Sequence, residues 1–416
     1  PAGGGFVSRA VSRYRPHLVN EAASVPSAWA GLRGAAAVVA SSLLVACAGA
    51  MRPTAVAPSL QRDGVPEGAG AVAWSPDGAT LAIARPDGVA LVDVRSGSAR
   101  SIVVPGAVAV DWAPAQMLLV VERDAGVGRV VTIDAVTGER RVLHSDPALV
   151  AARWLDASEG AWMALSATHD IRSYGTDVTL TLTVSTGRAP ARAHRWTLLL
   201  PTRNPAVDVA RGWAAARPNP IDHRIALAQL RKAPLFPPYL AVVVLDPFDG
   251  EAEDVAKVEL GRWTATTTWA PDGRRAALAA QDGTLRIVER GRQVEAPPGA
   301  ARGLHPSWHP GADVLFFGGW LVTPEATPIR KLVDRAADAT GFWSPAGDRL
   351  AVTVAGRLFV FGDLSIPPPD AETERRRRAA RASSWELGSL RSEGLLAPAI
   401  YRERRDRLSE RGAEVP

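Results

Sequence analysis

Residues 71–84 read AVAWSPDGATLAIA: a short apolar stretch that ends at Trp74, a Ser-Pro-Asp-Gly turn, and a second apolar stretch. Proline sets φ at about −65° in such a turn and glycine supplies a positive φ, so this segment predicts two strands joined by a tight turn. Similar segments surround six further tryptophans at intervals of 35 to 59 residues, most of them close to 40. The seven repeat tryptophans are Trp74, Trp112, Trp154, Trp213, Trp269, Trp308 and Trp343. A strand-rich repeat of about 40 residues is typical of β-propeller blades.

Each repeat has room for four short strands. In the first repeat an apolar strand at Thr80–Ala84 follows the turn, and further strands are expected at Ala90–Val94 and Arg100–Val104. Turns that begin with Asp and end with Gly close several third strands, at Asp93–Gly97, Asp134–Gly138 and Asp246–Gly250. Short strands at regular spacing favour an all-β fold. We therefore expect a seven-bladed β-propeller over residues 65–366, or a six-bladed one if the weak copy at Trp213 merges with a neighbour.

Two departures from the regular repeat predict how the ring closes and where its longest loops lie. The last repeat ends after Arg357–Phe361 without a fourth strand, and we expect the missing outer strand to come from the N-terminal side, around Pro53–Leu60. Such closure removes exposed strand edges. The two longest intervals contain insertions near Thr168–Thr176 and Arg231–Pro238, which we expect to be surface loops between second and third strands. Loops of this kind often carry binding sites.

The W-S-P-D-G-x-x-L/I-A pattern resembles the signature of TolB-type, WD40-like propellers over Ala71–Asp363. The resemblance implies the fold and says little about function, because this wider group includes periplasmic interaction proteins, propeller-bearing lipoproteins and the non-catalytic domains of prolyl oligopeptidase-type enzymes. We interpret the repeat tryptophans as structural anchors that pack between neighbouring blades, and none of them as a ligand.

Composition excludes several classes of protein. The chain has 416 residues, of which 47% are hydrophobic and 22% charged, which excludes wholesale disorder. A single cysteine excludes an internal disulfide framework and a cysteine-based zinc site. The net charge is +5, but basic residues are spread among nearly as many acids, so we predict no nucleic-acid partner.

The N-terminal region has the pattern of an export signal. The apolar run Ala35–Ala46 is too short to span a bilayer, which takes about 20 residues, and has the length of a signal-peptide core. The run ends in Leu44, Val45 and Ala46 before Cys47, a sequence that resembles the bacterial lipobox. The resemblance implies that the Cys47 thiol is lipidated and becomes the mature N-terminus, and the absence of Asp behind it favours the outer membrane. The alternative is a buried structural cysteine after an ordinary signal peptide.

These patterns divide the N-terminal region. We expect residues 1–46 to be an upstream extension followed by the lipoprotein signal peptide, and residues 47–64 to be the lipid-anchored tether. The first methionine is Met51, beyond the lipobox, so we hypothesise that translation starts near Val25.

The C-terminal region is polar and contains a helical pattern. We expect a Pro/Arg-rich linker at 367–384, in which Arg375–Arg378 form a solvated helical face or touch anionic lipid headgroups. Residues 385–411 resemble the SHOCT motif, a short helical hairpin, although Ala397–Ile400 depart from it. The matching residues are Leu390, Gly394, Leu395, Leu396, Tyr401, Arg405 and Leu408. A hairpin too small for a core of its own should dock on the propeller, self-associate or bind a partner.

Catalytic motifs are missing from the sequence. It contains no G-x-S-x-G elbow, phosphate-binding loop or H-E-x-x-H, and we assign no catalytic residue, cofactor or metal. The close pair His305 and His309 is interpreted as rim-loop histidines rather than metal ligands. The acidic residues Asp249, Glu251, Glu253 and Asp254 lack the spacing of a calcium loop and are interpreted as a solvated turn.

Together these features predict a bacterial envelope lipoprotein that is not an enzyme, held by its lipid at the outer membrane and facing the periplasm. Its propeller would be a protein–protein interaction platform for an unidentified envelope protein. The alternative is a propeller enzyme of lactonase or glycan-cleaving type with a site on the central channel. A third interpretation makes the C-terminal hairpin the functional part and the propeller a spacer.

Overall fold

The computed structural model describes residues 57–65, 71–113, 116–156, 160–172, 175–187, 191–200, 218–233, 236–259, 266–279, 283–289, 292–295, 302–334, 338–364, 366 and 371–413. All of them belong to one compact unit, Thr54–Pro416. The lipobox, Cys47 and the repeat residue Trp213 lie outside the described residues. Within the described part of the chain, neither helix combines the length and apolar character needed to cross a membrane.

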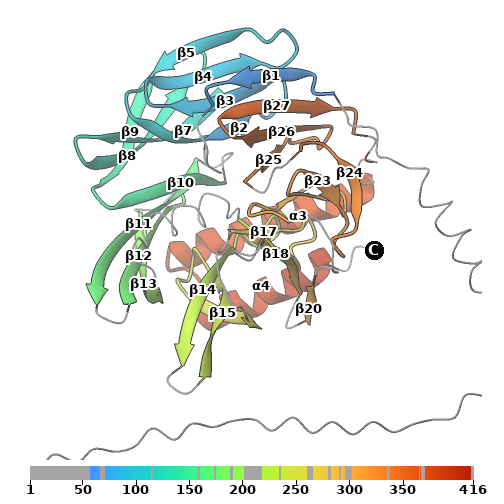
Figure 1. Ribbon diagram of the computed structural model, residues 1–416. Coiled ribbons are helices and arrows are strands. Elements are labelled where there is room, and N and C mark those ends of the chain that lie inside the picture. Colours follow the sequence, from blue (N-terminus) through green and yellow to red (C-terminus); the bar gives the residue numbers. More distant parts are fainter. Residues whose placement is uncertain are drawn as a thin grey trace, which may run out of the picture. The chain divides into compact units, whose positions relative to one another are not determined.

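The described residues form seven antiparallel sheets, which we number as blades 1 to 7 in chain order (Figure 1). Blade 1 contains β2 (Val72–Trp74), β3 (Thr80–Arg85), β4 (Gly88–Asp93) and β5 (Ala99–Val103). Blade 2 contains β6 (Ala107–Trp112), β7 (Met117–Asp124), β8 (Val127–Asp134) and β9 (Arg140–Asp146). Blade 3 contains β10 (Leu149–Asp156), β11 (Ala161–Arg172), β12 (Gly175–Ser185) and β13 (Arg192–Leu200).

The remaining blades follow the same order. Blade 4 contains β14 (Ile225–Ala233), β15 (Phe236–Leu245) and β16 (Ala252–Glu259). Blade 5 contains β17 (Thr266–Trp269), β18 (Arg275–Ala279), β19 (Leu285–Glu289) and β20 (Arg292–Glu295). Blade 6 contains β21 (Ser307–Trp308), β22 (Leu315–Phe317), β23 (Trp320–Val322) and β24 (Pro328–Lys331). Blade 7 contains β25 (Thr340–Trp343), β26 (Arg349–Val354), β27 (Arg357–Gly362) and β1 (Leu60–Asp63).

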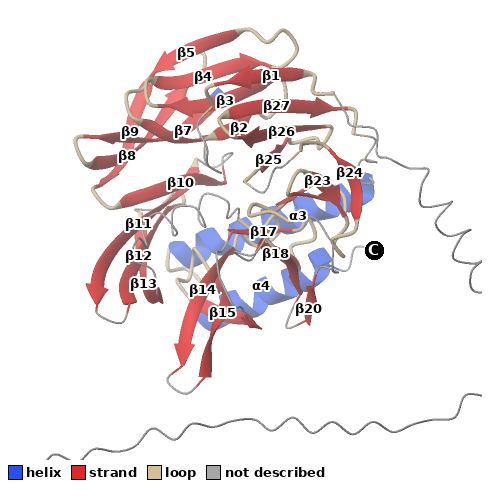
Figure 2. Cartoon of the chain, viewed as in Figure 1, coloured by secondary structure: helices blue, strands red, loops and turns tan. Residues whose placement is uncertain are grey.

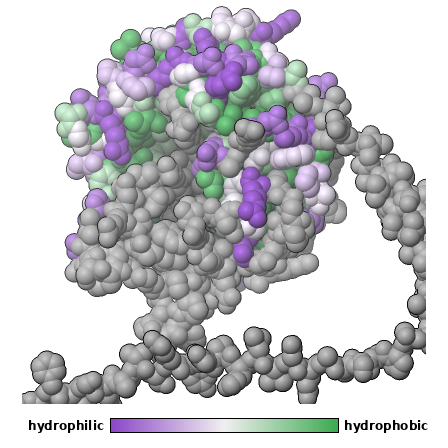
Figure 3. Space-filling view, in the orientation of Figure 1, coloured by the Kyte–Doolittle hydropathy of each residue, from purple (hydrophilic) through white to green (hydrophobic). Residues whose placement is uncertain are grey.

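The seven-bladed propeller is thereby confirmed, and the six-bladed alternative is wrong. Blade 4, whose expected first strand at Trp213 lies outside the described residues, is a sheet of its own. First strands of neighbouring blades contact one another, β2 with β6, β6 with β10, and β17 with β21, so they surround the axis of the ring. Each blade buries its faces against the next, as blades 1 and 2 do around Leu91, Val110 and Leu118. On the described surface in Figure 3, hydrophilic and hydrophobic residues are interspersed.

The ring closes between its two ends, as expected. Strand β1 pairs antiparallel with β27, with Leu60 opposite Val360 and Asp63 opposite Arg357. The strand thus lies at the C-terminal end of the segment in which it was expected and extends beyond it. Because β1 is antiparallel to β27, the chain enters β1 beside the end of β27, where the Ser59 N–H donates to the Val360 carbonyl (2.7 Å).

The turns that follow the first strands lie on one face of the ring, which we call the turn face. Turns of successive blades hydrogen-bond to one another there. Arg349 Nη1 donates to the Gly78 carbonyl (3.1 Å), joining blades 7 and 1, and Asn219 Nδ2 donates to the Gly273 carbonyl (2.8 Å), joining blades 4 and 5. Gly78 has a φ of 68°, the positive value that its turn requires. Hairpins between second and third strands lie on the opposite face, since neighbouring strands are antiparallel.

The two insertions form strands rather than the surface loops that we expected. In blade 3, β11 and β12 stay paired as far as Arg172 opposite Gly175. In blade 4, β14 and β15 stay paired as far as Ala233 opposite Phe236. The inserted residues include several β-branched and aromatic side chains, which favour a pleated sheet. Blades 3 and 4 therefore carry long hairpins that project on the face opposite the turn face (Figure 1).

Two helices follow the propeller, α3 (Ala371–Ser392) and α4 (Pro398–Ala413) (Figure 2). Of the residues expected as a linker, 371–384 therefore form the first part of α3, and 367–370 lie outside the described residues. Glu372 in the first turn pairs with Arg375 and Arg376, which stabilises this part through i,i+3 and i,i+4 ion pairs and the helix dipole. Gly394, with a φ of 80°, follows the end of α3, and Pro398 is the first residue of α4. The two helices contact each other as a hairpin.

Candidate functional site

Helix α3 crosses the axis of the ring on the turn face. It begins shortly after Ile366, which packs on the core between blades 6 and 7. Arg381 donates from Nη1 to the Pro220 carbonyl of blade 4 and from Nη2 to the Leu155 carbonyl of blade 3, both at 3.3 Å. Blades 3 and 4 are opposite blade 7 in a ring of seven. The ten residue steps from Ala371 to Arg381, about 15 Å of helix, therefore pass over the centre.

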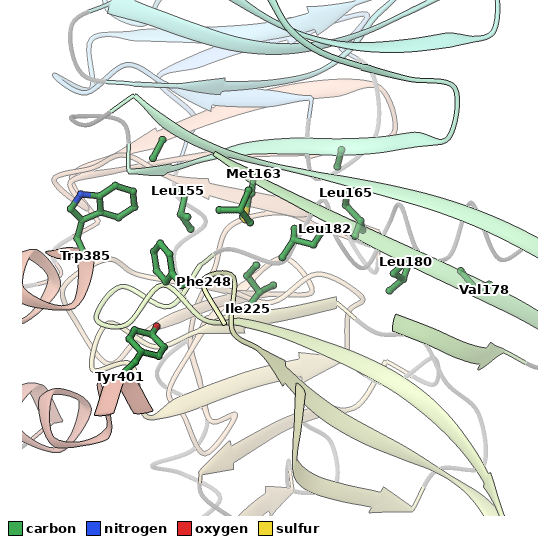
Figure 4. Packing of buried hydrophobic residues seen from close by; sticks show 13 residues of the cluster. Leu155, Met163, Leu165, Val178, Leu180, Leu182, Ile225, Phe248, Trp385 and Tyr401 are labelled. Carbon is green, nitrogen blue, oxygen red and sulfur yellow. The ribbon is translucent and has the colours of Figure 1, made fainter. Parts of the chain in front are cut away.

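An aromatic cluster holds the hairpin on blades 3 and 4. Trp385 of α3 packs edge-on against Phe248 and His223, with ring centroids 5.6 Å apart in both pairs. Tyr401 of α4 is buried in the same hydrophobic cluster, with Met163 from β11. Figure 4 shows Trp385 and Tyr401 extending from the two helices toward Phe248. The two-helix hairpin thus shares a core with the propeller, one of the three outcomes expected for it.

A buried ion pair lies beside this cluster. Arg405 Nη1 of α4 donates to Asp246 Oδ2 at 2.6 Å, and the Tyr401 hydroxyl lies 3.1 Å from the same oxygen. Asp246 Oδ1 accepts the N–H groups of Phe248 and Asp249, as an Asx turn does. Burial and the Asp246 carboxylate raise the pKa of Tyr401. Burial opposes the charge of Arg405, but Asp246 outweighs it and raises the pKa of Arg405.

The acidic residues after Asp246 are partly engaged by the hairpin. Arg391 of α3 pairs with Asp249 at 2.8 Å, and Arg402 of α4 pairs with Glu251 at 2.9 Å. The Asp249 side chain is only 3% exposed. The interpretation as a solvated turn is therefore wrong for Asp249, whereas Glu253 is exposed as expected. Opposite charges on the hairpin and on blade 4 explain why the hairpin docks there.

A fully buried histidine lies under α3. His223 belongs to the first turn of blade 4, has a φ of 61° and stacks edge-on against Trp385. Burial, reinforced by the Arg381 cation, lowers the pKa of His223 to about 3. The adjacent Asp222 is also buried and pairs with Arg224 at 2.6 Å. The sequence analysis did not identify His223 or Asp222. The signal for them in the sequence is that the first turn of blade 4 departs from the Pro-Asp-Gly pattern.

The histidine pair singled out in the sequence does not form a metal centre in the described structure. His309 Nδ1 accepts the N–H groups of Gly311 (3.0 Å) and Ala312 (2.8 Å), so its Nε2–H points to the Gly347 carbonyl at 3.0 Å. Burial lowers the pKa of His309, which keeps the ring neutral. Among the described residues, no group of three or more His, Cys, Asp or Glu is placed to hold a metal ion. His309 thus has a structural position between blades 6 and 7.

Five of the described repeat tryptophans lie between blades. Trp74 Nε1 donates to the Phe342 carbonyl of blade 7 at 2.8 Å, and Trp343 Nε1 donates to the Ser307 carbonyl of blade 6 at 3.1 Å. Trp308 is buried in the core between blades 5 and 6. Trp112 and Trp154 are half-buried against the cores that blades 2 and 3 share with the preceding blade. Trp269 is half-buried at the end of β17.

Comparisons with known proteins include two solved structures that are distant from the chain in sequence. No protein-family model and no curated protein matches the chain. Among solved structures, the chain is similar to TolB from Acinetobacter baumannii, with 16% identity over 53% of this chain and a TM-score of 0.36; the match spans about half, 51%, of TolB. It is also similar to a chain of the mitotic checkpoint complex, with 12% identity over 83% of this chain and 98% of that chain, and a TM-score of 0.45. The propeller assignment rests on the seven sheets themselves.

Proposed function

We propose that this chain is a lipid-anchored protein of the bacterial envelope whose propeller is a binding platform for another envelope protein. The observation that carries the proposal is the difference between the two faces of the ring. The α3–α4 hairpin covers the turn face at blades 3 and 4. On the opposite face the same two blades are extended by the long hairpins β11–β12 and β14–β15. The extended face, on which the described residues place neither helix, is therefore the face that we assign to a partner.

The short segment before β1 limits the distance between the propeller and the proposed anchor. The chain enters β1 at the turn-face end of blade 7, beside Val360. Nine residues separate Cys47 from Ala57, the first described residue, and a fully extended chain over these ten residue steps reaches at most about 35 Å. A lipid on Cys47 would therefore keep the start of β1 within about this distance of the membrane surface. Tethering also raises the effective concentration of the platform for envelope partners.

The anchor is tested by metabolic labelling with an alkyne fatty acid. Wild-type protein is expected to take up the label and to fractionate with membranes. Cys47→Ala is expected to lose the label completely, whereas Ala48→Ser, a matched change at the next position, keeps it. Equal labelling of the Cys47→Ala protein would rule out lipidation at this residue.

The platform is tested separately by site-specific photo-crosslinking in intact cells. The crosslinker replaces His169, an exposed residue of β11, and in a second strain Ser383, an exposed residue of α3 on the other face. A discrete product with one envelope protein from the position 169 probe, and not from the position 383 probe, supports the proposal. Products from position 383 alone, or from neither position, contradict it. Because this experiment does not depend on lipid attachment, the two halves of the proposal fail independently.

A further inference from the structure

Helix α3 presents one stripe of residues to the ring, and two arginines lie in that stripe. Ala380, Ser384 and Gly388 are buried along it, at the spacing of successive helical turns. Arg377 and Arg381 lie one turn apart on the same side. Because α3 crosses the axis between blade 7 and Arg381, Arg377 lies over the centre of the ring on its turn face.

Two of the three nitrogens of the partly buried Arg377 guanidinium are buried without a partner in the described structure. Its Nε and Nη1 atoms each expose less than 1 Å² and have no hydrogen-bond partner within the described structure. The neighbouring arginines of the same run differ from it, since Arg376 pairs with Glu372 and Arg378 pairs with Glu374 at the surface. Buried N–H groups without acceptors are rare and costly in folded proteins. Two such groups on one cation indicate a missing anionic acceptor.

Arg381 adds a second positive charge, which nearby negative charge neutralises only in part. Its hydrogen bonds go to the Pro220 and Leu155 carbonyls, which carry no net charge. Burial lowers the pKa of Arg381, and the Asp156 carboxylate offsets this only in part. Two arginines of α3 thus lie one turn apart in partly buried surroundings, and Asp156 is the carboxylate that acts on Arg381. Charge-assisted hydrogen bonds are strong in such surroundings.

We infer that Arg377 and Arg381 form a binding site for a small anion, a carboxylate or phosphate group, at the turn-face end of the ring axis. Arg377 supplies the two unused N–H groups that bind the anion directly. Arg381, one turn further on, adds positive charge while its own donors hold α3 on blades 3 and 4. This site is independent of the proposed envelope function, since it needs neither the lipid nor a protein partner.

The site is tested by titration of the purified full chain with inorganic phosphate and, separately, with acetate, at constant ionic strength adjusted with sodium chloride. Saturable heat in calorimetry and a saturable rise in the unfolding midpoint with at least one of the two anions are expected. Phosphate-only or acetate-only binding identifies which group the site accepts. A response to neither anion beyond that to chloride overturns the proposal.

Two variants locate the site. Arg377→Gln is expected to weaken binding of the responding anion at least tenfold, because it removes the cation and one of the two N–H donors. Arg378→Gln, its exposed neighbour in the same helix, is the matched control and leaves binding unchanged. Equal affinity in the wild type and in Arg377→Gln assigns the anion to another place and overturns the proposal. Circular dichroism of each variant confirms that the comparison is made between folded proteins.

Discussion

Replacement of Arg405 by Met is expected to release helix α4 from the propeller. The Arg405 side chain is 9% exposed and that of Asp246 is 2% exposed, with 2.6 Å between Nη1 and Oδ2. Methionine keeps most of the length and apolar contact of the side chain but leaves the Asp246 carboxylate buried without its cation. Removal of one partner of a buried pair costs about 3–5 kcal/mol. The lower end applies here, because Asp246 keeps the Tyr401 hydroxyl and two backbone N–H groups.

A loss of about 3 kcal/mol in docking free energy raises the opening equilibrium of the hairpin by a factor of about 10². Amide hydrogen exchange followed by mass spectrometry measures this directly, as faster exchange of peptides from α4. Peptides from blades 5 to 7, such as one covering β26, should be unaffected. A uniform acceleration over the whole chain would mean global destabilisation instead of local release.

The control is Arg407→Met in the same helix. Arg407 pairs with Glu403, but the two side chains are 67% and 60% exposed, and such surface pairs contribute at most about 1 kcal/mol. Exchange in α4 should therefore change by less than a factor of about 5. Equal exchange in the Arg405→Met and Arg407→Met proteins would refute the view that the Asp246 ion pair holds the hairpin.

Three further predictions concern the stability of the whole unit. His223 has the ordinary histidine pKa of 6.5 in the unfolded state and a pKa of about 3 in the folded state. Between these two pH values only the unfolded state binds the proton, so the free energy of unfolding falls as the pH is lowered. Between pH 7.5 and pH 5, the free energy of unfolding measured with urea should therefore fall by about 2 kcal/mol less in His223→Phe than in the wild type. Gly388→Ala would place Cβ 2.6 Å from the Phe248 ring, and the unfolding free energy should fall by about 1–3 kcal/mol; an unchanged unfolding midpoint would show that α3 shifts freely. Trp74→Phe removes the hydrogen bond between blades 1 and 7, and denaturant unfolding should show a loss of about 1–3 kcal/mol with an unaltered circular dichroism spectrum.

The propeller was predictable because its information is local and repeated. A tryptophan, a Pro-Asp-Gly turn and an apolar strand specify the first two strands of a blade through turn chemistry and side-chain alternation alone. Repetition of this unit predicted the ring, and the missing fourth strand after Phe361 predicted its closure by the N-terminal segment that became β1. Closure was predictable since an open strand edge is unfavourable in any ring of this kind.

Local sequence patterns did not predict the secondary structure of segments whose composition suits two different structures. The insertion near Thr168–Thr176 has turn residues that suit a loop as well as a hairpin, and cross-strand pairing decided for strands. The charged segment before Trp385 has the composition of a linker. Glu–Arg pairs within the helix and the contacts of Arg381 with two blades stabilise it as α3.

The sequence by itself determined the blades and their order, because these follow from contacts between residues that are close in the chain or repeated along it. It also indicated how the ring closes, because the last repeat lacks a fourth strand of its own. Only the tertiary structure decided which of three similar turns is a docking site. Among the described residues, the carboxylates of Asp93 and Asp134 accept hydrogen bonds only from residues of their own turns. Asp246 also binds Arg405, 159 positions away. A turn motif specifies its own backbone hydrogen bonds, whereas the side chain that reaches it from a distant helix depends on how the whole chain packs.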